Sequence, residues 1–333
     1  MKVLGFGDLL IHFSPMCCDR FMQTDSVKMS FTGAEANVCC ALGMWDEDIS
    51  FVTRVPDNIL SKRALTFLKG QNIDTSHVAF GGKRIGVYYL ENGASVRSSL
   101  VIYDRENSGF TESVSSDYDI DGMLEGVSVL YLTGITCMLS ENLFETSKIL
   151  CKKAYERGVK IFFDVNYRPA LGTPKQSGGI LKELAPYIFC LITNEEHIKM
   201  LLGISSEYGE EDVSERLTDI TDKARNILHI PQIAVTVRRT PSASDSVTFA
   251  AFNDGKDFAI SKVYRTHVVD RVGSGDAFSA GLIYGHIHGF NVSDAVEFAA
   301  ASCAFKHTVH GDIGFACVDE ITAVIKGNTD VKR

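Results

Sequence analysis

Short apolar runs alternate with predicted helices along most of this chain, and this alternation limits its possible folds more than any other feature. Parallel strands need a crossover connection, usually a helix, so a repeated strand–helix order predicts a mostly parallel sheet. Helices would cover both faces of that sheet in three α/β/α layers. The predicted strands are residues 3–6, 49–52, 127–132, 160–164, 189–192, 233–237, 247–252 and 258–263, and the predicted helices are residues 34–42, 59–71, 142–157, 194–202, 275–288 and 292–306.

Two stretches, residues 11–31 and residues 82–108, interrupt the alternation. In the second, residues 86–91 and 99–103 flank the turn signal Glu91-Asn92-Gly93, which predicts antiparallel strands. Both stretches are inserted between strand–helix units of one sheet, so we expect a small β lid over the sheet edge and not an independent domain. The expected division is an α/β core that binds nucleotide and substrate, made of residues 1–10, 32–81 and 109–333, and a lid made of residues 11–31 and 82–108.

Composition excludes several classes of protein. With 333 residues, 45% of them hydrophobic and 23% charged, the chain is long enough for a proper core in one large domain or two. A net charge of -9 argues against a broad surface for nucleic acid or anionic membrane. The most apolar stretches are shorter than the ~18 residues that a membrane-spanning helix requires. We therefore expect neither nucleic acid nor a membrane as a partner.

The nine cysteines are expected to be reduced thiols in a cytoplasmic protein. They include the adjacent pairs Cys17/Cys18 and Cys39/Cys40, but the chain is long and shows no signal peptide, which disfavours a disulfide framework. The sequence has no CxxC pair and no Cys/His cluster at zinc spacing, so no metal site is expected from these residues.

The most informative local motif is the glycine-rich run VDRVGSGDAF at residues 269–278, which precedes an apolar helix. Gly273 and Gly275 allow a sharp turn and the close approach of a ligand, at which the unpaired N–H groups of the helix point. Asp276, in the first helical turn, is placed to accept a proton from a hydroxyl while those N–H groups stabilise a transferring phosphoryl group. On local chemistry alone, an ordinary capped helix start explains the run equally well.

This run resembles the DTxGAGDxF signature of the PfkB carbohydrate kinases, and it lies near the C-terminal end of the chain as in that family. Arg271 replaces the usual threonine and Ser274 the usual alanine, but both glycines and the aspartate remain. The run GAEAN at residues 33–37, followed by ALG, resembles the first signature of the family, so the resemblance covers nearly the whole chain. It implies a ribokinase-like fold and an ATP- and Mg²⁺-dependent kinase, with Asp276 as the catalytic base beside Gly273, Ser274 and Gly275.

By the same resemblance Asp8, Gly33 and Asn37 face the phosphoryl acceptor. The residues also allow simpler explanations, because Asp8 can end a strand in a turn and Asn37 can lie on an exposed helix face. Competing phosphate motifs are missing from the sequence. It contains no GxxxxGK[ST] run, and Leu10 stands where a dinucleotide fingerprint has its third glycine, which disfavours an oxidoreductase.

Two further stretches resemble 2-keto-3-deoxygluconate kinases: the YDR triplet that ends at Arg105 and the segment DVNYRP that contains Arg168. These arginines come from separate elements and are expected to converge on one carboxylate, which a planar guanidinium group suits. Tyr89 and Tyr103, on lid strands, are expected to hydrogen-bond the sugar acid. Each arginine also has a simpler interpretation as a surface cation or a structural ion pair.

On the nucleotide side, Asn194-Glu195-Glu196 is similar to the NxxE element that the family links to Mg²⁺ and phosphate, but His197 occupies the place of its glutamate. Glu196 or water is then left to substitute, and no direct metal ligand is assigned because Mg²⁺ prefers few protein ligands. Asn194 as a helix cap and Arg238 as a surface cation stay open. The ATP site implied by the resemblance consists of Gly273 and Gly275 with Asn166, Asn194, Thr236 and Arg238.

The sequence therefore predicts a kinase that transfers the ATP γ-phosphoryl group to a sugar acid, foremost 2-dehydro-3-deoxy-D-gluconate, giving its 6-phosphate. Two alternatives stay open: a neutral-sugar kinase of the fructokinase or ribokinase type, and a non-catalytic PfkB-like regulator that binds a metabolite. The intact Asp276 disfavours the regulator, since a pure binder needs no base. Exposed lid edges tend to be covered, which favours a homodimer or higher homo-oligomer that meets through the lids.

Overall fold

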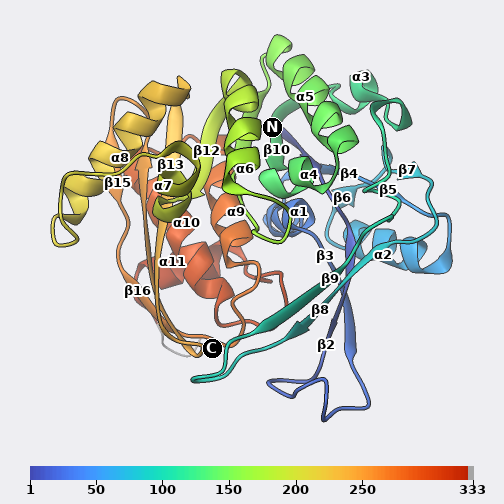
Figure 1. Ribbon diagram of the computed structural model, residues 1–333. Helices are drawn as coiled ribbons and strands as arrows, with labels where there is room; N and C mark the ends of the chain where they lie inside the picture. The colour runs from blue at the N-terminus through green and yellow to red at the C-terminus, as the bar shows by residue number, and fades with distance from the viewer. Residues whose placement is uncertain (329–333) are drawn as a thin grey trace.

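A ten-stranded sheet forms the centre of the computed structural model, which describes residues 1–328 (Figure 1). Its order is β6 (Ile73–Asp74), β4 (Asp48–Val52), β1 (Lys2–Phe6), β10 (Val127–Thr133), β11 (Lys160–Asp164), β12 (Ile188–Asn194), β13 (Gln232–Ser242), β14 (Asp245–Asn253) and β15 (Phe258–Ile260), with β16 (Tyr264–His267) also paired to β14. All pairs from β6 to β13 are parallel, and the pairs that involve β14 are antiparallel.

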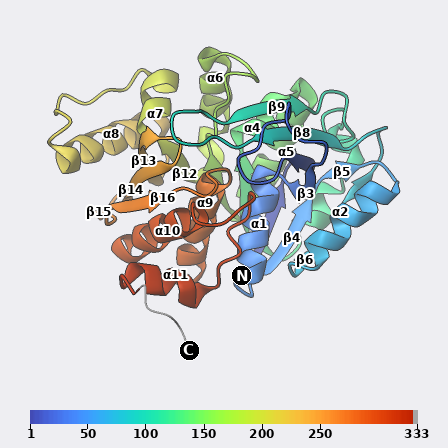
Figure 2. The same cartoon turned by 90° about the horizontal axis from the view of Figure 1, so that it is seen from below.

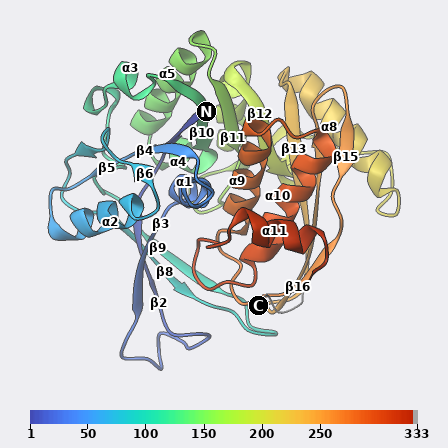
Figure 3. The same cartoon turned by 180° about the vertical axis from the view of Figure 1, so that it is seen from behind.

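The parallel strands are buried on both faces, which explains their nearly continuous apolar composition. In β11, for example, Phe162 packs into the core on one face, whereas its neighbours Ile161 and Phe163 pack into the core on the other. The first core is covered by α1 (Ala34–Met44), α2 (Ile59–Lys69), α9 (Ser274–Ile287), α10 (Val292–Lys306) and α11 (Val318–Ile325), several of which face the viewer in Figure 3. The second core is covered by α3 (Ile120–Met123), α4 (Gly134–Leu139), α5 (Glu141–Glu156), α6 (Pro174–Leu184), α7 (Glu195–Leu202) and α8 (Val213–Leu228).

A separate four-stranded sheet projects from the core at the lower right of Figure 1. Its order is β3 (Lys28–Thr32), β2 (Leu10–Ser14), β8 (Gly86–Glu91) and β9 (Leu100–Asp104). The connection between β8 and β9 reaches the β13–β14 turn, where Ser95 O accepts from Ala243 N at 2.7 Å and Ser95 N donates to Ser244 Oγ at 2.8 Å (Figure 2). Two-residue strands β5 (Arg54–Val55) and β7 (Ala79–Phe80) pair nearby.

The predicted three-layer architecture with a mostly parallel sheet is confirmed, and several element boundaries agree with the prediction to the residue, as in β11 and α10. The predicted antiparallel pair is confirmed, because β8 matches residues 86–91 and pairs with β9, which begins one residue later than predicted. Glu91 pairs with Leu100, and the eight intervening positions form a loop with a bridge between Ala94 and Arg97. The predicted strand 258–263 ends at Ile260. Within residues 1–328, no helix combines the length and the apolar character needed to cross a membrane.

Candidate active site

A cleft of about 740 Å³ lies along the carboxyl ends of the parallel strands. Asp8 follows β1, Asp164 ends β11 and Asn194 ends β12, and all three line this cleft. The lid sheet contributes Tyr88 and Tyr103 to the lining. In open α/β sheets, ligands bind outside the carboxyl ends of the strands. This cleft is therefore the candidate active site.

The helices α1 and α9 begin at the cleft without a side-chain cap. Helices α2, α5, α6, α7 and α10 each begin at an Asn, Ser or Thr whose side chain accepts a hydrogen bond from a first-turn amide. By contrast, α1 and α9 begin at Gly33 and Gly273, which offer no such acceptor. First-turn amides have no partner within their own helix, so these two helix starts present N–H donors to an anionic ligand.

Two glycines shape the turn before α9 in different ways. Gly273 has a φ of 79°, in the left-handed region, and a Cβ there would collide with the main-chain carbonyl of Asp312. A Cβ at Gly275 would meet nothing within 4 Å, and this residue lines the cleft. Gly273 is therefore required by the fold of the turn, whereas the missing side chain of Gly275 leaves space for a ligand.

Asp276 lies in the first turn of α9, on the lining of the cleft. Its Oδ2 accepts a hydrogen bond of 2.7 Å from Asn37 Nδ2, in the first turn of α1. Burial raises the pKa of Asp276 to about 7, against the lowering effect of the Asn37 hydrogen bond and with a further rise caused by Asp164. The simpler interpretation of Asn37 as an exposed residue is wrong, since it is buried and bonded to the candidate base.

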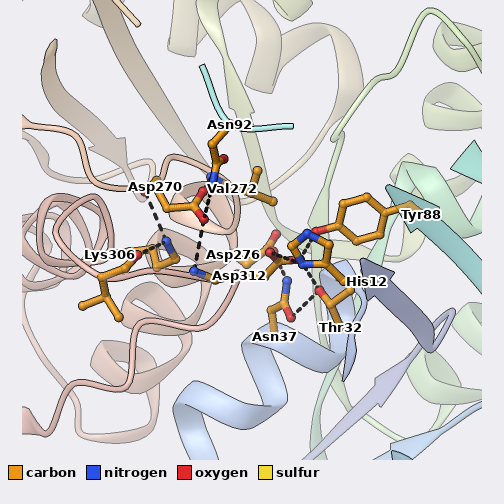
Figure 4. Close-up of polar contacts among 12 residues, drawn as sticks. His12, Thr32, Asn37, Tyr88, Asn92, Asp270, Val272, Asp276, Lys306 and Asp312 are labelled. Carbon is orange, nitrogen blue, oxygen red and sulfur yellow. Dashed lines mark hydrogen bonds and ion pairs between the residues drawn. The ribbon is translucent and has the colours of Figure 1, made fainter. Parts of the chain in front are cut away.

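A buried polar cluster, which the sequence did not reveal, adjoins Asp276 (Figure 4). The Asp312 carboxylate accepts hydrogen bonds from the Tyr88 hydroxyl and from Thr32 Oγ1, the latter at 2.6 Å, and it lies 3.2 Å from His12 Nδ1. Thr32 Oγ1 is also 3.0 Å from Asn37 Oδ1, which links the cluster to Asp276. Burial opposes ionisation of Asp312, but the interactions with His12, Thr32 and Tyr88 outweigh it and lower its pKa.

Asp8 and Arg105 leave polar atoms unpaired at the cleft. Asp8 is buried, and within residues 1–328 neither of its carboxylate oxygens has a well-formed hydrogen-bond partner. Burial raises the pKa of Asp8 to about 6, although Arg105 pulls it down. The Arg105 guanidinium lies 4.5 Å from the centre of the Tyr103 ring, and its Nε and Nη2 are likewise without a partner in the described part of the chain. Buried polar groups are normally satisfied, so these atoms are available to the polar groups of a ligand.

Asp164, on the β11 side of the cleft, is like Asp312 a carboxylate that the site predicted from the sequence did not include. Burial raises the pKa of Asp164 to about 7, and the nearby Arg168 opposes this rise. Asp164 Oδ1 accepts a 3.0 Å hydrogen bond from the amide of Asn166, whose φ of 40° lies in the left-handed region. Asp164 thus fixes the loop that presents Asn166 and Arg168 to the cleft.

Most of the residues singled out from the sequence lie together on this cleft, but Tyr89 does not. Successive residues of a strand point to opposite faces, and on β8 it is Tyr88 that lines the cleft. Tyr89 lies on the other face, where it stacks on Phe13 with ring centroids 5.8 Å apart. The residues that do line the cleft are Asp8, Gly33, Asn37, Tyr103, Arg105, Asn166, Arg168, Asn194, Thr236, Arg238, Gly273, Ser274, Gly275 and Asp276.

Asn194 caps α7, the simpler of its two interpretations, and also lines the cleft. Its Oδ1 accepts from the amide of His197 at 2.7 Å. Burial, with Arg168 and Arg238 nearby, lowers the pKa of His197 to about 4, so the ring is neutral at physiological pH. A histidine ring is either neutral or cationic, so His197 cannot supply the negative charge of the glutamate expected at this place. Glu195 is engaged in an ion pair with Arg216.

Thr236 and Arg238 lie within β13, because this strand continues to Ser242 and does not end at residue 237 as predicted. Arg271, which replaces a threonine of the resembled signature, donates to the carbonyls of Ser242 at 3.1 Å and Ala243 at 2.7 Å. Arg271 thus ties the β13–β14 turn to the glycine-rich turn.

The cleft suits Mg²⁺ held through phosphate and water better than Mg²⁺ held by a protein cage. Within residues 1–328, no three His, Cys, Asp or Glu side chains are grouped to hold a metal ion. Asp164 and Glu196 line the same cleft and are available to water molecules around such an ion. Mg²⁺ keeps several waters and binds few carboxylates when a substrate supplies phosphate oxygens.

The chain is similar to known carbohydrate kinases over nearly its whole length. The profile of the pfkB family of carbohydrate kinases matches residues 2–317. The chain is 29% identical to the 2-dehydro-3-deoxygalactonokinase of Haloferax volcanii over 98% of this chain and 97% of that protein, and 24% identical to the 5-dehydro-2-deoxygluconokinase of Clostridium tetani over 98% and 93%. The crystal structure of the 2-dehydro-3-deoxygluconokinase of Thermotoga maritima superposes with a TM-score of 0.93 at 35% identity, covering 98% of this chain and 100% of that one.

Proposed function

The chain belongs to the pfkB family of carbohydrate kinases, and we propose that it transfers the γ-phosphoryl group of ATP to a keto-deoxy sugar acid, foremost 2-dehydro-3-deoxy-D-gluconate, giving the 6-phosphate. The observation that carries this proposal is the placement of Asp276. Its carboxyl group lies at the uncapped start of α9, on an open cleft that Arg105 and Arg168 also line. The three relatives described above all phosphorylate, by their names, sugar acids of this kind.

Asp276 is the catalytic base of the proposed reaction. It accepts the proton of the acceptor hydroxyl while that oxygen forms a bond to the γ-phosphorus and the bond from this phosphorus to the ADP oxygen breaks. A pKa of about 7 leaves a large share of the carboxylate ionised at neutral pH and still basic enough to take a proton.

Charge on the transferring phosphoryl group is stabilised by the first-turn N–H groups of α9. Asn194, Thr236 and Arg238, with Asn166 at the β11 loop, would hold ATP, and Mg²⁺ would supply neutralisation of part of the phosphate charge. These assignments rest on the lining of the cleft and on the family to which the chain belongs.

The acceptor carboxylate binds Arg105 and Arg168, and the unpaired oxygens of Asp8 accept from its hydroxyl groups. Tyr103 and Tyr88 contribute the lid side of this pocket. A neutral sugar has no carboxylate to offer these two guanidinium groups, and within the described residues Nε and Nη2 of Arg105 have no hydrogen-bond partner, which favours an acid.

Residues 11–31 and 82–108 act as a lid, and two chains meet through their lids. β9 is an edge strand of the lid sheet, and its apolar residues Leu100, Val101 and Ile102 are all exposed. Such an edge tends to be covered by another chain. Light scattering checks this proposal: the wild type should have the mass of a homo-oligomer and Ile102→Lys that of a monomer, whereas a monomeric wild type would contradict it.

A cytoplasmic location fits the free thiols of all nine cysteines, six of them buried. The decisive test of the activity is ADP release in the presence of Mg²⁺ over a panel of keto-deoxy sugar acids and neutral sugars. Turnover of the acids should exceed that of fructose and ribose by a wide margin. Preference for a neutral sugar would overturn the assignment of the arginines.

A further inference from the structure

Lys306, the last residue of α10, has a completely buried side chain that the mechanism above does not use. Its ammonium group donates to the main-chain carbonyls of Asp270 at 3.2 Å and Val309 at 3.0 Å (Figure 4). Within the described residues 1–328 no carboxylate forms an ion pair with it. A buried lysine is normally paired with a carboxylate because desolvation disfavours its charge. Lys306 is instead held by carbonyl oxygens.

Asp270, the residue whose carbonyl Lys306 binds, opens the glycine-rich turn and is bonded through each of its other polar groups. Its amide donates to His307 O at 3.3 Å, its Oδ1 accepts from Val272 N at 3.1 Å, and its Oδ2 accepts from Gly311 N at 3.0 Å. Asp270 therefore joins the glycine-rich turn to the segment that follows α10, and the ammonium group lies at that junction.

The same segment reaches the catalytic part of the cleft. It ends at Asp312, whose main-chain carbonyl packs against Gly273 and whose carboxylate belongs to the buried cluster with Thr32 and Tyr88. A shift of this segment would move Gly273 and, with it, the first-turn N–H groups of α9. Burial lowers the pKa of Lys306, but the carboxylates of Asp270, Asp312 and Asp276 oppose this and favour the charged form.

We infer that the Lys306 ammonium group is a built-in monovalent cation that holds the glycine-rich turn in its phosphoryl-binding shape. A set of main-chain carbonyl oxygens around one positive charge is also how proteins coordinate K⁺. Lys306 is a positioning residue: it contacts main-chain oxygens of Asp270 and Val309 and acts on the reaction through them. The kinetic part of this inference rests on the proposed function, whereas the binding part does not.

The variant Lys306→Met tests the inference, because methionine is apolar and ends one atom short of the ammonium position. Its kcat for ADP formation should fall by about 10- to 100-fold, with little change in KM, since misplaced donors weaken the transition state more than ground-state binding. Ammonium or K⁺ ions should restore a large part of kcat, and tetramethylammonium at equal ionic strength should not, because it is too large for the vacated position. The same small cations should raise the melting temperature of the variant.

The wild type and a second lysine provide the controls. Wild-type activity and melting temperature should be the same in Na⁺, K⁺ and tetramethylammonium. Lys262→Met should resemble the wild type, because Lys262 also donates to a main-chain carbonyl, that of Ile325 at 2.8 Å, but its side chain is exposed and its ammonium group contacts α11 and not the glycine-rich turn.

Three results would overturn the inference: wild-type kcat in Lys306→Met, an impaired variant that no small cation activates or stabilises, or a wild type that K⁺ itself activates. Should Lys306→Met not fold, the cation dependence of the wild type decides alone. Should the wild type phosphorylate none of the sugars, the proposed function fails, and the melting experiment still decides whether Lys306 replaces a bound cation.

Discussion

Removing the amide of Asn37 should shift the pH profile of the enzyme and leave its maximal rate largely intact. Asn37 Nδ2 donates a 2.7 Å hydrogen bond to Asp276 Oδ2 and so stabilises the ionised carboxylate. Without this bond the protonated form is favoured, and the pKa of Asp276 rises further above its present value of about 7. A hydrogen bond to a charged group contributes about 1.5–3 kcal/mol, and each pKa unit corresponds to about 1.4 kcal/mol.

For Asn37→Ala these magnitudes correspond to a rise of about one to two pKa units. The acidic midpoint of kcat/KM, which reports the free enzyme, should therefore move from about 7 in the wild type to roughly 8–9 in the variant. At pH 7 the kcat/KM of the variant should be about 5- to 50-fold lower than that of the wild type. It should approach the wild-type value near pH 9.5, which is about one half to one and a half pH units above the new midpoint. Asp164 titrates in the same range and raises the pKa of Asp276, so the profile reports the pair.

The assay is initial-rate ADP release from pH 5.5 to 10 with saturating Mg²⁺ and ATP. Asn253→Ala is the matched control, since Asn253 is also buried and donates to Thr221 at 3.0 Å, on the far part of the sheet. It should lower stability without moving the midpoint. An unshifted midpoint in Asn37→Ala, or a loss that is equal at every pH, would show that Asn37 does not tune the base.

Substitutions in the glycine-rich turn, at the two arginines and at Asp8 test other parts of the site. Gly273→Ala should lower the free energy of unfolding in denaturant by about 1–3 kcal/mol, because Gly273 has a left-handed φ and a Cβ there would collide with Asp312. Gly275→Ala should fold normally and raise the KM for ATP. Equal losses of stability in the two variants would contradict this contrast. Arg105→Met and Arg168→Met should each raise the KM for sugar acids by about 10- to 100-fold, and equal effects on fructose in initial-rate assays would refute carboxylate binding. Burial raises the folded-state pKa of Asp8 to about 6 from 3.8, so the native protein loses stability as pH rises through this range. Asp8→Asn should therefore have a higher melting temperature than the wild type at pH 8, and this difference should disappear below pH 4. A lower melting temperature of the variant at pH 8 would contradict this linkage.

The architecture was predictable because the parallel strands are buried on both faces and are therefore written as short apolar runs between helices. Boundaries were accurate where a cap or a glycine marks them, as at Gly33 before α1 and Asn291 before α10. Helix α6 was missed although its start carries a signal: Thr173 and Gln176 form a capping box around Pro174.

The site was only partly predictable, for two physical reasons. Tyr88 and Tyr89 are adjacent on one strand and point to opposite faces, and only the placement of the lid decides which of them reaches the cleft. The polar cluster depends on contacts between residues far apart in the chain, such as Thr32 with Asp312, which no local motif announces. Asp276 and Asn37 were identified because each lies in a compact signature.

We propose above all that Asp276, at the start of α9, accepts the proton of the acceptor hydroxyl. The most direct test of this role is single-turnover and steady-state ADP formation by Asp276→Asn with 2-dehydro-3-deoxy-D-gluconate, alongside calorimetric titration with ATP and Mg²⁺. Turnover should fall by about 10²- to 10⁴-fold while the affinity for ATP stays within a few-fold of the wild type. Turnover at the wild-type rate would contradict the account.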